Sequence, residues 1–381
     1  MKLINTYILL VCATIAVTLH SCSDSFLQRD SLVAVSSGTF WTSEDALSGL
    51  AACYDGLQNN FLYNGDLYKG GGPLAMDCMT DNGGHFNWTG WMPGYDICNG
   101  IHTSSSWMVT SYWMGAEEIK RCNALIGNID KVPMDASKVE IYKAEAVVLR
   151  SLMYTNLTML YHDVPYFTSI QSVTDAKAAK TDRTTIVADV MKDLKDAAKV
   201  LPPTASSWGR MTKGAALSLL GRLALYNEKW DEAISAYRQV KELGYSLYKT
   251  GDNPYMDLFT EANEQCNEII MSVRYEGPGK EEGNAMAPHY DAPLEAMNGT
   301  IDLADAFYDI TTGKPTTDKK IVNGLTTEGK PDLWDPNTTR YNNRDPRLKV
   351  TLFIPWDGWN DKWPNAYGGS APSNSTLYVL K

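Results

Sequence analysis

The strongest pattern in the sequence is the recurrence of apolar residues at three- and four-residue spacing, which is typical of amphipathic helices. Beyond residue 104 the pattern returns in five successive segments, at 104–129, 137–161, 187–201, 211–227 and 229–243. Each such helix has one apolar stripe and must bury it against a neighbour. The pattern therefore predicts a mainly α-helical scaffold.

An earlier helix is predicted to begin near Thr42, an N-cap candidate that is followed by the acidic residues Glu44 and Asp45. Its apolar positions are Leu47, Leu50, Ala51, Tyr54 and Leu57. Residues 59–104 then break the helical pattern with several Gly residues and Pro93. We predict a long loop insertion there, and a loop of that length in a compact domain usually carries function.

The last two helices can be compared with the tetratricopeptide repeat, a pair of helices joined by a tight turn. Leu220 and Gly221 in the first helix, with Ala233 and Tyr237 in the second, match the repeat at the expected offsets. The small residues let two helices approach closely, and Gly244 is placed as a C-terminal cap. The Trp and Pro of the repeat are absent at their offsets, so a helical hairpin unrelated to the repeat is the alternative.

The chain changes character after Gly244. Residues 268–274 are apolar enough to predict a strand, and residues 276–381 contain many turn-forming dipeptides. We therefore predict a helical scaffold over residues 42–275, interrupted by the insertion at 59–104. A loop-rich region with a few short strands follows over residues 276–381 and is expected to hold the ligand.

The N-terminus is typical of an exported protein. Lys2 is followed by a mostly apolar stretch that is too short to span a bilayer and that ends at Leu19. The sequence from Leu19 to Cys22 resembles a lipobox, the site at which bacterial lipoproteins are cleaved and lipidated. We expect residues 1–21 to be a signal peptide, Cys22 to carry the lipid, and residues 22–41 to form a tether. The alternative is a buried N-terminal helix that contains an ordinary Cys.

The cysteines indicate neither a metal site nor a dense disulfide framework. Export would remove Cys12 and lipidation would use Cys22, which leaves Cys53, Cys78, Cys98, Cys122 and Cys266. No CxxC spacing is present among them, and the histidines lack ligand spacing, so we predict no metal and no cofactor. One disulfide is compatible with an exported chain. The sequence leaves its pairing open.

The charge balance excludes one large class of partners. The chain has 34 Lys and Arg against 45 Asp and Glu, a formal net charge of −11. The basic residues form no runs, whereas nucleic-acid-binding proteins generally present a basic patch. We therefore predict no nucleic-acid partner.

The aromatic composition is unusual, with 11 Trp and 21 Tyr against only 8 Phe. Trp and Tyr combine an apolar ring with a polar group, and a flat ring suits the C–H face of a sugar while Asp, Asn and Arg bond its hydroxyls. Two Gly- and Asn-containing loops concentrate such residues, around 85–91 and 356–363. The candidate ligand-binding residues are Asp81, Asn82, His85, Trp88, Trp91, Tyr290, Trp356, Trp359 and Trp363. The alternative is that these Trp residues anchor loops to the scaffold, the role we predict for Trp41 and Trp230 at helix starts.

Several stretches, in this order and spacing, resemble the SusD/RagB family of surface nutrient-binding lipoproteins. They are Phe40 to Ala46, Cys122 to Ile126, Ala144 to Arg150, Val164 to Phe167, Thr212 to Ala216, Gly244 to Leu247, Asp257 to Phe259, Asn267 to Ile270 and Asp345 to Leu348. The resemblance implies a scaffold of four tetratricopeptide-like helix pairs that supports a variable ligand-binding region.

The resemblance also implies a function. Such a protein is an oligosaccharide-binding lipoprotein on the cell surface, attached to the outer membrane, and it delivers its ligand to a SusC-like TonB-dependent transporter. Members usually continue well beyond the equivalent of Leu380. Because ending at the strand-like Leu377 to Leu380 would expose an unpaired edge, we expect a truncated sequence.

An enzyme would need a catalytic constellation, and the sequence contains none that is recognisable. Acidic pairs such as Glu281 with Glu282, or Asp302 with Asp305, carry no spacing that would place two carboxylates across a sugar. The GxSxG, HExxH and phosphate-loop motifs are absent. We predict a binding protein without catalysis. The alternative functions are an interaction scaffold built from helical repeats, or a peptide- or glycopeptide-binding lid of the transporter.

Overall fold

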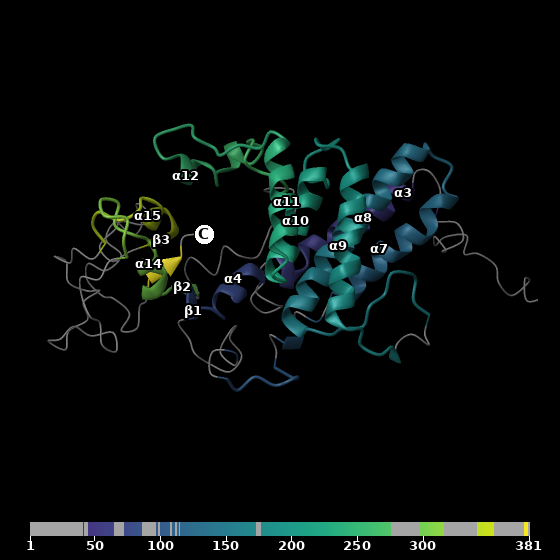
Figure 1. Cartoon of the computed structure of the whole chain (residues 1–381), viewed down its shortest axis with the longest axis horizontal. Helices are drawn as coiled ribbons and strands as arrows, with labels where there is room; N and C mark the ends of the chain where they lie inside the picture. The colour runs from purple at the N-terminus through teal and green to yellow at the C-terminus, as the bar shows by residue number, and fades with distance from the viewer. Residues whose placement is uncertain are drawn as a thin grey trace, which may run out of the picture.

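The computed structural model describes the helical scaffold almost completely and the C-terminal region in part. The described residues are 41, 45–64, 72–85, 97, 100–106, 109–110, 113, 115–172, 177–275, 297–315, 341–353 and 377–379. Six long helices dominate the described part of the chain, and a small sheet lies beside one end of their array (Figure 1).

The six helices pack in chain order, each against the next. They are α3 (Asp45–Asp55), α7 (Ala116–Asn128), α8 (Ala136–Tyr161), α9 (Arg183–Val200), α10 (Lys213–Tyr226) and α11 (Trp230–Glu242). One continuous apolar core runs through all of them. This arrangement confirms the mainly α-helical prediction and the predicted bounds of the helix over 137–161.

Side chains at the helix ends explain where these helices begin and stop. The carboxylates of Asp135 and Asp182 accept backbone N–H bonds at the starts of α8 and α9, and Thr212 caps α10 in the same way. Helix α8 ends because His162 turns into the left-handed region with a φ of 65°, and Gly244 follows α11 with a φ of 90°. His162 is therefore a helix-end residue.

The pair α10 and α11 has the packing that the repeat pattern predicted. A Cβ atom at Gly221 would lie 2.7 Å from the ring of Tyr237, so only glycine fits at this crossing. Ala233 is 2% exposed at the same contact. The residues of the match therefore meet in a closely packed pair of helices.

Three local predictions were wrong. The helix expected over 104–129 is not continuous from residue 104, since residues 101–106 form turns stabilised by Thr103 and Ser106; residues 109–110 are helical, and the long helix begins at Ala116. Residues 268–274 pair with no strand of the described chain, because their apolar side chains pack against the helical core instead. Leu47 and Trp230, expected to be packing residues, are 54% and 56% exposed. Trp41 does pack as predicted, against Gly49.

The predicted insertion at 59–104 contains regular structure. The short helices on and around it are η1 (Gly56–Gln58), η2 (Asn60–Asn64) and α4 (Gly72–Asp77), and strand β1 (Gly83–His85) follows. Elsewhere the scaffold has the short helices η4 (Ile129–Lys131), α12 (Pro254–Asp257) and η6 (Glu261–Asn263). The insertion thus connects the scaffold to the sheet.

The sheet has four short antiparallel strands in the order β1-β2-β4-β3. The last three are β2 (Met297–Gly299), β3 (Leu352–Phe353) and β4 (Leu377–Val379). Strand β4 pairs with β2 on one side and β3 on the other, so the expectation that Leu377 and its neighbours expose an unpaired edge was wrong. The pairing was invisible in the sequence because the partner strands are only two or three residues long.

A second, smaller core lies beside this sheet. Helices α14 (Ile301–Ala306) and α15 (Arg347–Thr351) contribute Ala304 and Leu348, which are fully buried together with Leu352. The buried guanidinium of Arg344 donates to the carbonyl oxygens of Ala304 and Phe307 and so joins the two helical segments. The predicted loop-rich region therefore has its own packed centre.

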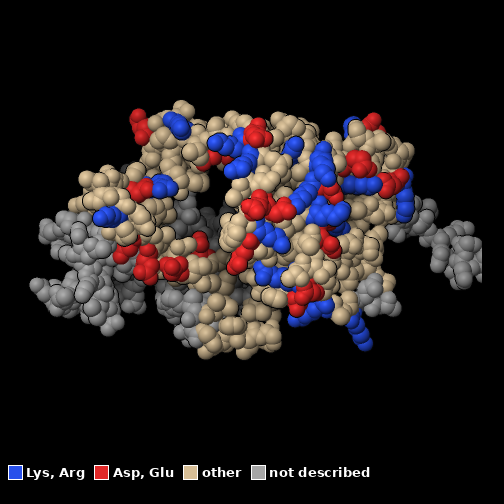
Figure 2. Space-filling model, viewed as in Figure 1, with Lys and Arg blue, Asp and Glu red and all other residues tan. Residues whose placement is uncertain are grey.

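The helical part carries charged side chains of both signs on its surface. On the face shown in Figure 2, Lys and Arg side chains are interspersed with Asp and Glu over the helical part. Many are paired, as Lys192 and Lys199 are with Asp196. None of the helices in the described ranges combines the length and the apolar character that crossing a membrane requires.

Candidate functional site

The structure describes only part of the predicted ligand site. Asp81 and Asn82 form the exposed turn before β1, and the backbone of His85 is the last residue of that strand. The remaining candidates and the predicted lipidation residue lie outside the described residues; they are Trp88, Trp91, Tyr290, Trp356, Trp359, Trp363 and Cys22. The sheet nevertheless fixes where the chain leads into and out of the segments that carry them.

The register of the sheet assigns two of these segments to one edge. His85 is paired with Met297, the first residue of β2. From His85 the chain continues toward Trp88 and Trp91, and it arrives at Met297 from the direction of Tyr290. The two segments therefore leave and enter the sheet side by side.

The opposite edge of the sheet is the one at which β1 begins. Gly83 is paired with Gly299, and Gly299 with Leu377, so the starts of β1 and β4 lie at the same edge. The segment 354–376, which contains Trp356, Trp359 and Trp363, leaves β3 and returns to the sheet at this edge. Asp81 and Asn82 precede Gly83 and therefore lie there as well.

Local contacts hold the turn at Asp81 and Asn82. The backbone N–H of Thr300 donates to the carbonyl of Asn82 over 3.0 Å, and the Thr300 hydroxyl donates to the carbonyl of Asp81. The side chain of Asn82 bonds to Asp77, whose pKa is raised by burial. Asn82 is therefore part of the turn's own structure, whereas the exposed Asp81 is the better placed of the two for a ligand.

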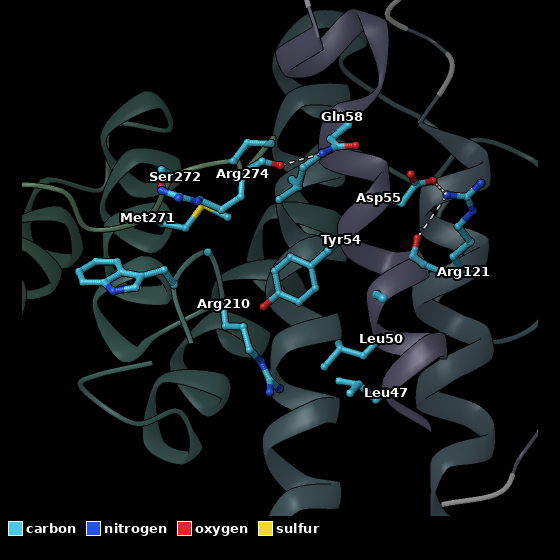
Figure 3. A pocket seen from close by; sticks show the side chains of 16 residues that line it. Leu47, Leu50, Tyr54, Asp55, Gln58, Arg121, Arg210, Met271, Ser272 and Arg274 are labelled. Carbon is cyan, nitrogen blue, oxygen red and sulfur yellow. Dashed lines mark hydrogen bonds and ion pairs between the residues drawn. The ribbon is translucent and has the colours of Figure 1, made fainter. Parts of the chain in front are cut away.

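A concave site that the sequence analysis did not predict lies on the helical scaffold. It is a pocket of about 730 Å³ between α3, the loop before α10, and residues 271–274 (Figure 3). Leu47 and Trp208 supply apolar surface, and each is 54% exposed. The signal that could have revealed it is Trp208, an aromatic residue within a polar loop.

The pocket wall depends on a glycine. Gly209 has a φ of 85°, and a Cβ atom there would lie 2.7 Å from Cγ of Arg274. Arg274 in turn is paired with Glu264 at 2.6 Å, and its carbonyl accepts a bond from Gln58 over 2.7 Å. These contacts fasten residues 271–274 across the scaffold and close one side of the pocket.

A buried polar network forms another wall. The carboxylate of Glu145 accepts bonds from the Tyr54 hydroxyl at 2.5 Å and from both Nε and Nη2 of Arg210. The Tyr54 oxygen also accepts the backbone N–H of Met211 over 2.7 Å. Burial, followed by the charge of Glu145, raises the pKa of Tyr54 far above its ordinary value. Tyr54 therefore stays neutral and acts as a structural hydrogen-bond bridge.

The charged residues around the pocket are paired within the protein. Arg121 contacts Asp55 at 2.5 Å and donates to the carbonyl of Ala52, while Arg210 is held by Glu145. Exposed apolar and aromatic surface is thus the main part of the pocket that a partner could contact. In the described part of the chain no group of three His, Cys, Asp or Glu residues is arranged to hold a metal.

Comparison with known proteins gives a consistent picture. Residues 63–225 match a SusD-like family model that is described as starch-binding and associating with the outer membrane. SusD-like protein P25 of Formosa agariphila is 25% identical over 272 residues, which are 67% of this chain and 49% of that protein. The chain spans about half the length of the curated relatives it matches.

Solved structures share the fold. A SusD-like protein from Bacteroides fragilis has a TM-score of 0.72 at 20% identity, covering 92% of this chain and 70% of that one. A laminarin-binding SusD-like protein has a TM-score of 0.65 at 21% identity, covering 89% and 72%. The matched family and this structure are both described by what they bind. The chain therefore contains a SusD-like domain over residues 63–225 and shares the fold of SusD-like structures, which agrees with the resemblance of its sequence motifs.

Proposed function

We propose that this protein is a cell-surface, outer-membrane lipoprotein that binds an oligosaccharide and delivers it to a SusC-like TonB-dependent transporter. The observation that carries the proposal is the matched family's description as starch-binding and associated with the outer membrane. The sheet supports it, because the chain segments that contain the aromatic candidates begin or end at strands β1 to β4.

Binding would rest on stacking and hydrogen bonds, with no bond broken. A Trp ring covers the C–H face of a sugar, and carboxylate or amide groups bond the hydroxyls at the rim. Asp81 is exposed at the edge where the segment with Trp356, Trp359 and Trp363 joins the sheet, and it would supply the polar contact. His85, Trp88, Trp91 and Tyr290 would form a second group of contacts at the other edge.

A panel of glycans would identify the ligand. Affinity electrophoresis of a form that begins after Cys22 would include starch fragments, because of the family description, and laminarin, because of the laminarin-binding structural neighbour. We expect retardation by at least one glycan. A folded protein that no glycan of the panel retards would contradict glycan capture.

The lipid anchor is a separate part of the proposal. Acyl chains on Cys22 would hold the protein on the membrane at ~0.8 kcal/mol per buried CH₂, with residues 22–41 as a tether. Replacement Cys22→Ala should prevent incorporation of labelled palmitate and move the protein out of the membrane fraction. Unchanged membrane retention of Cys22→Ala would contradict anchoring at this residue.

A second candidate function is an interaction scaffold for the transporter, and the pocket at Leu47 and Trp208 favours it. Its exposed apolar surface lies on the helical array, away from the sheet. The substitution Trp208→Ala tests this reading. If Trp208→Ala abolishes co-purification with the transporter while Trp88→Ala and Trp359→Ala leave glycan uptake unchanged, the scaffold function is supported over glycan capture.

A further inference from the structure

Two cysteines meet at the contact between helices α3 and α7. Cys53 lies on α3 and Cys122 on α7, and each is 1% exposed. Both are free thiols in the structure; Cys53 Sγ donates to the carbonyl of Gly49 over 3.3 Å, and Cys53 is close enough to Cys122 to raise the pKa of its thiol. The sulfur atoms are therefore neighbours in the core, although the residues are far apart in the sequence.

The register of the two helices places the pair independently of the thiol contact. Helices α3 and α7 run antiparallel, as contacts show between Gly49 and Leu125, Asp55 and Arg121, and Gly56 and Glu118. Along the chain, Cys53 lies between the first and the last of these contacts. Cys122 is the residue of α7 at the same level. The two side chains thus face each other across the helix contact.

The helices also approach closely at this level. A Cβ atom on Gly56 would lie 2.6 Å from Cγ of Glu118, and one on Gly49 would lie 3.4 Å from Cδ1 of Leu125. Gly56 therefore has no room for a side chain against α7, and Gly49 is in ordinary van der Waals contact with it. A disulfide requires Cα atoms within about 4.4 to 6.8 Å, and small flanking residues are what allow two packed helices to come so near.

We propose that Cys53 and Cys122 form a disulfide bond in the exported protein. One thiolate attacks a disulfide donor RSSR, a low-molecular-weight or protein disulfide, and releases one RSH; the second cysteine then attacks the mixed disulfide and releases the other. Two cysteine thiols and RSSR become one cystine and two RSH. The oxidising compartment is the part of the proposed function on which this inference rests.

The bond would form before the helices close. The hydrogen bond with Cys53 and burial raise the pKa of Cys122 well above its ordinary value, so the folded pair contains little of the reactive thiolate. Once formed, the bond closes the segment between residues 53 and 122 into a loop that includes the turn at Asp81 and strand β1. It would tie together the two scaffold helices from which this insertion leaves and to which it returns.

Peptide mapping tests the bond in the full chain exported by a Gram-negative host with its own leader. Cells are quenched in acid, the protein is denatured, free thiols are alkylated, and trypsin is added without reductant. Cleavage after Arg29, Lys69, Arg121 and Lys131 should give residues 30–69 linked to residues 122–131, with Cys78 and Cys266 alkylated. Alkylation of Cys53 and Cys122, or linkage of either to another cysteine, would overturn the proposal.

Thermal unfolding gives a second readout. A reductant should lower the unfolding midpoint of the wild-type chain by several degrees and leave that of the Cys53→Ala/Cys122→Ala variant unchanged. The control Cys266→Ala should keep the reductant effect, because Cys266 lies outside the pair. A thermal unfolding midpoint of the wild-type chain that does not change with the reductant would contradict the bond. Glycan binding by a chain with both thiols free would contradict the disulfide alone and leave the proposed function intact.

Discussion

Arg150 shows why some residues of this chain are recognisable as a family signature. Its buried guanidinium donates to Asn123 over 2.8 Å, to the carbonyl of Thr168 over 3.0 Å, and to Asp193 over 2.8 Å. Asn123 then donates to the carbonyls of Phe167 and Ser169. One charge thus joins α7, α8, α9 and the loop after α8, so the separate motifs of the sequence are parts of one structural unit.

We expect Arg150→Met to destabilise the protein strongly. The substitution leaves the partner groups of Arg150 inside the structure without their donor, and breaking a buried ion pair typically costs about 3 to 5 kcal/mol. Denaturant unfolding measures the effect. The matched control Lys192→Met removes a cation from an exposed pair on the neighbouring helix and should leave the midpoint unchanged. Equal effects of the two substitutions would contradict the role assigned to Arg150.

The glycine at the crossing of α10 and α11 gives another test. We expect Gly221→Ala to cost roughly 1 to 3 kcal/mol, because the added methyl group meets the Tyr237 ring. Gly127→Ala is the matched control within a helix, since there a Cβ meets only the flexible end of Ile170 at 3.3 Å. The control should be close to neutral in denaturant unfolding. An unchanged free energy of unfolding in Gly221→Ala would show that the two helices can separate without loss of stability.

At the scale of elements, the helices of the scaffold were predictable and the strands were not. Helix α8 shows three signals that agree: its apolar residues recur at helical spacing, Asp135 caps its start, and Val164-Pro165 follows its end. Residues 268–274 had a strand-like composition, but their apolar side chains found a surface on the helical core. Composition predicts burial, whereas strand identity depends on a distant partner.

Leu47 shows the same limit on a helix. It has the spacing of a core residue in α3, yet Ala46, Leu50, Cys53 and Leu57 form the buried face, and Leu47 lines the pocket instead. A helix in an array contacts neighbours on particular sides only, and periodicity alone does not tell which stripe faces them. The helical periodicity of α3 therefore did not predict the pocket.

The caps of α8 and α9 predict a pH dependence. Bonds from the Ser137 hydroxyl and nearby backbone N–H groups lower the pKa of Asp135, and Thr184 does the same for Asp182. Because the folded pKa lies below the ordinary value of 3.8, the stabilisation is complete above that pH and is lost as pH falls through the folded pKa.

The Asp135→Ser/Asp182→Ser variant keeps capping oxygens that do not titrate. We expect its unfolding midpoint in denaturant to fall less steeply than that of the wild type between about pH 5 and about pH 2.5. The two proteins should differ least at the acid end. Parallel curves over the whole range would rule out a contribution of these two carboxylates to acid sensitivity.

At the scale of the whole molecule, family and ligand site are carried by different residues. Many of the recognisable motifs bury polar groups in the helical array, as Asn123, Arg150 and Glu145 do, or fill a core, as Leu348 does. Packing requires these residue types at these positions, so a sequence can reveal them. The candidate ligand residues were chosen from loop chemistry alone, and of these the structure describes Asp81, Asn82 and the backbone of His85.

The most direct test of the central claim is calorimetric titration of the chain with the oligosaccharide found in the panel. We predict saturable binding that falls at least tenfold, about 1.4 kcal/mol, in the Trp88→Ala/Trp359→Ala variant. The control Trp208→Ala, an exposed Trp on the scaffold, should bind as the wild type does. Binding that survives loss of Trp88 and Trp359, or that disappears with Trp208, would contradict glycan capture by the loops around the sheet.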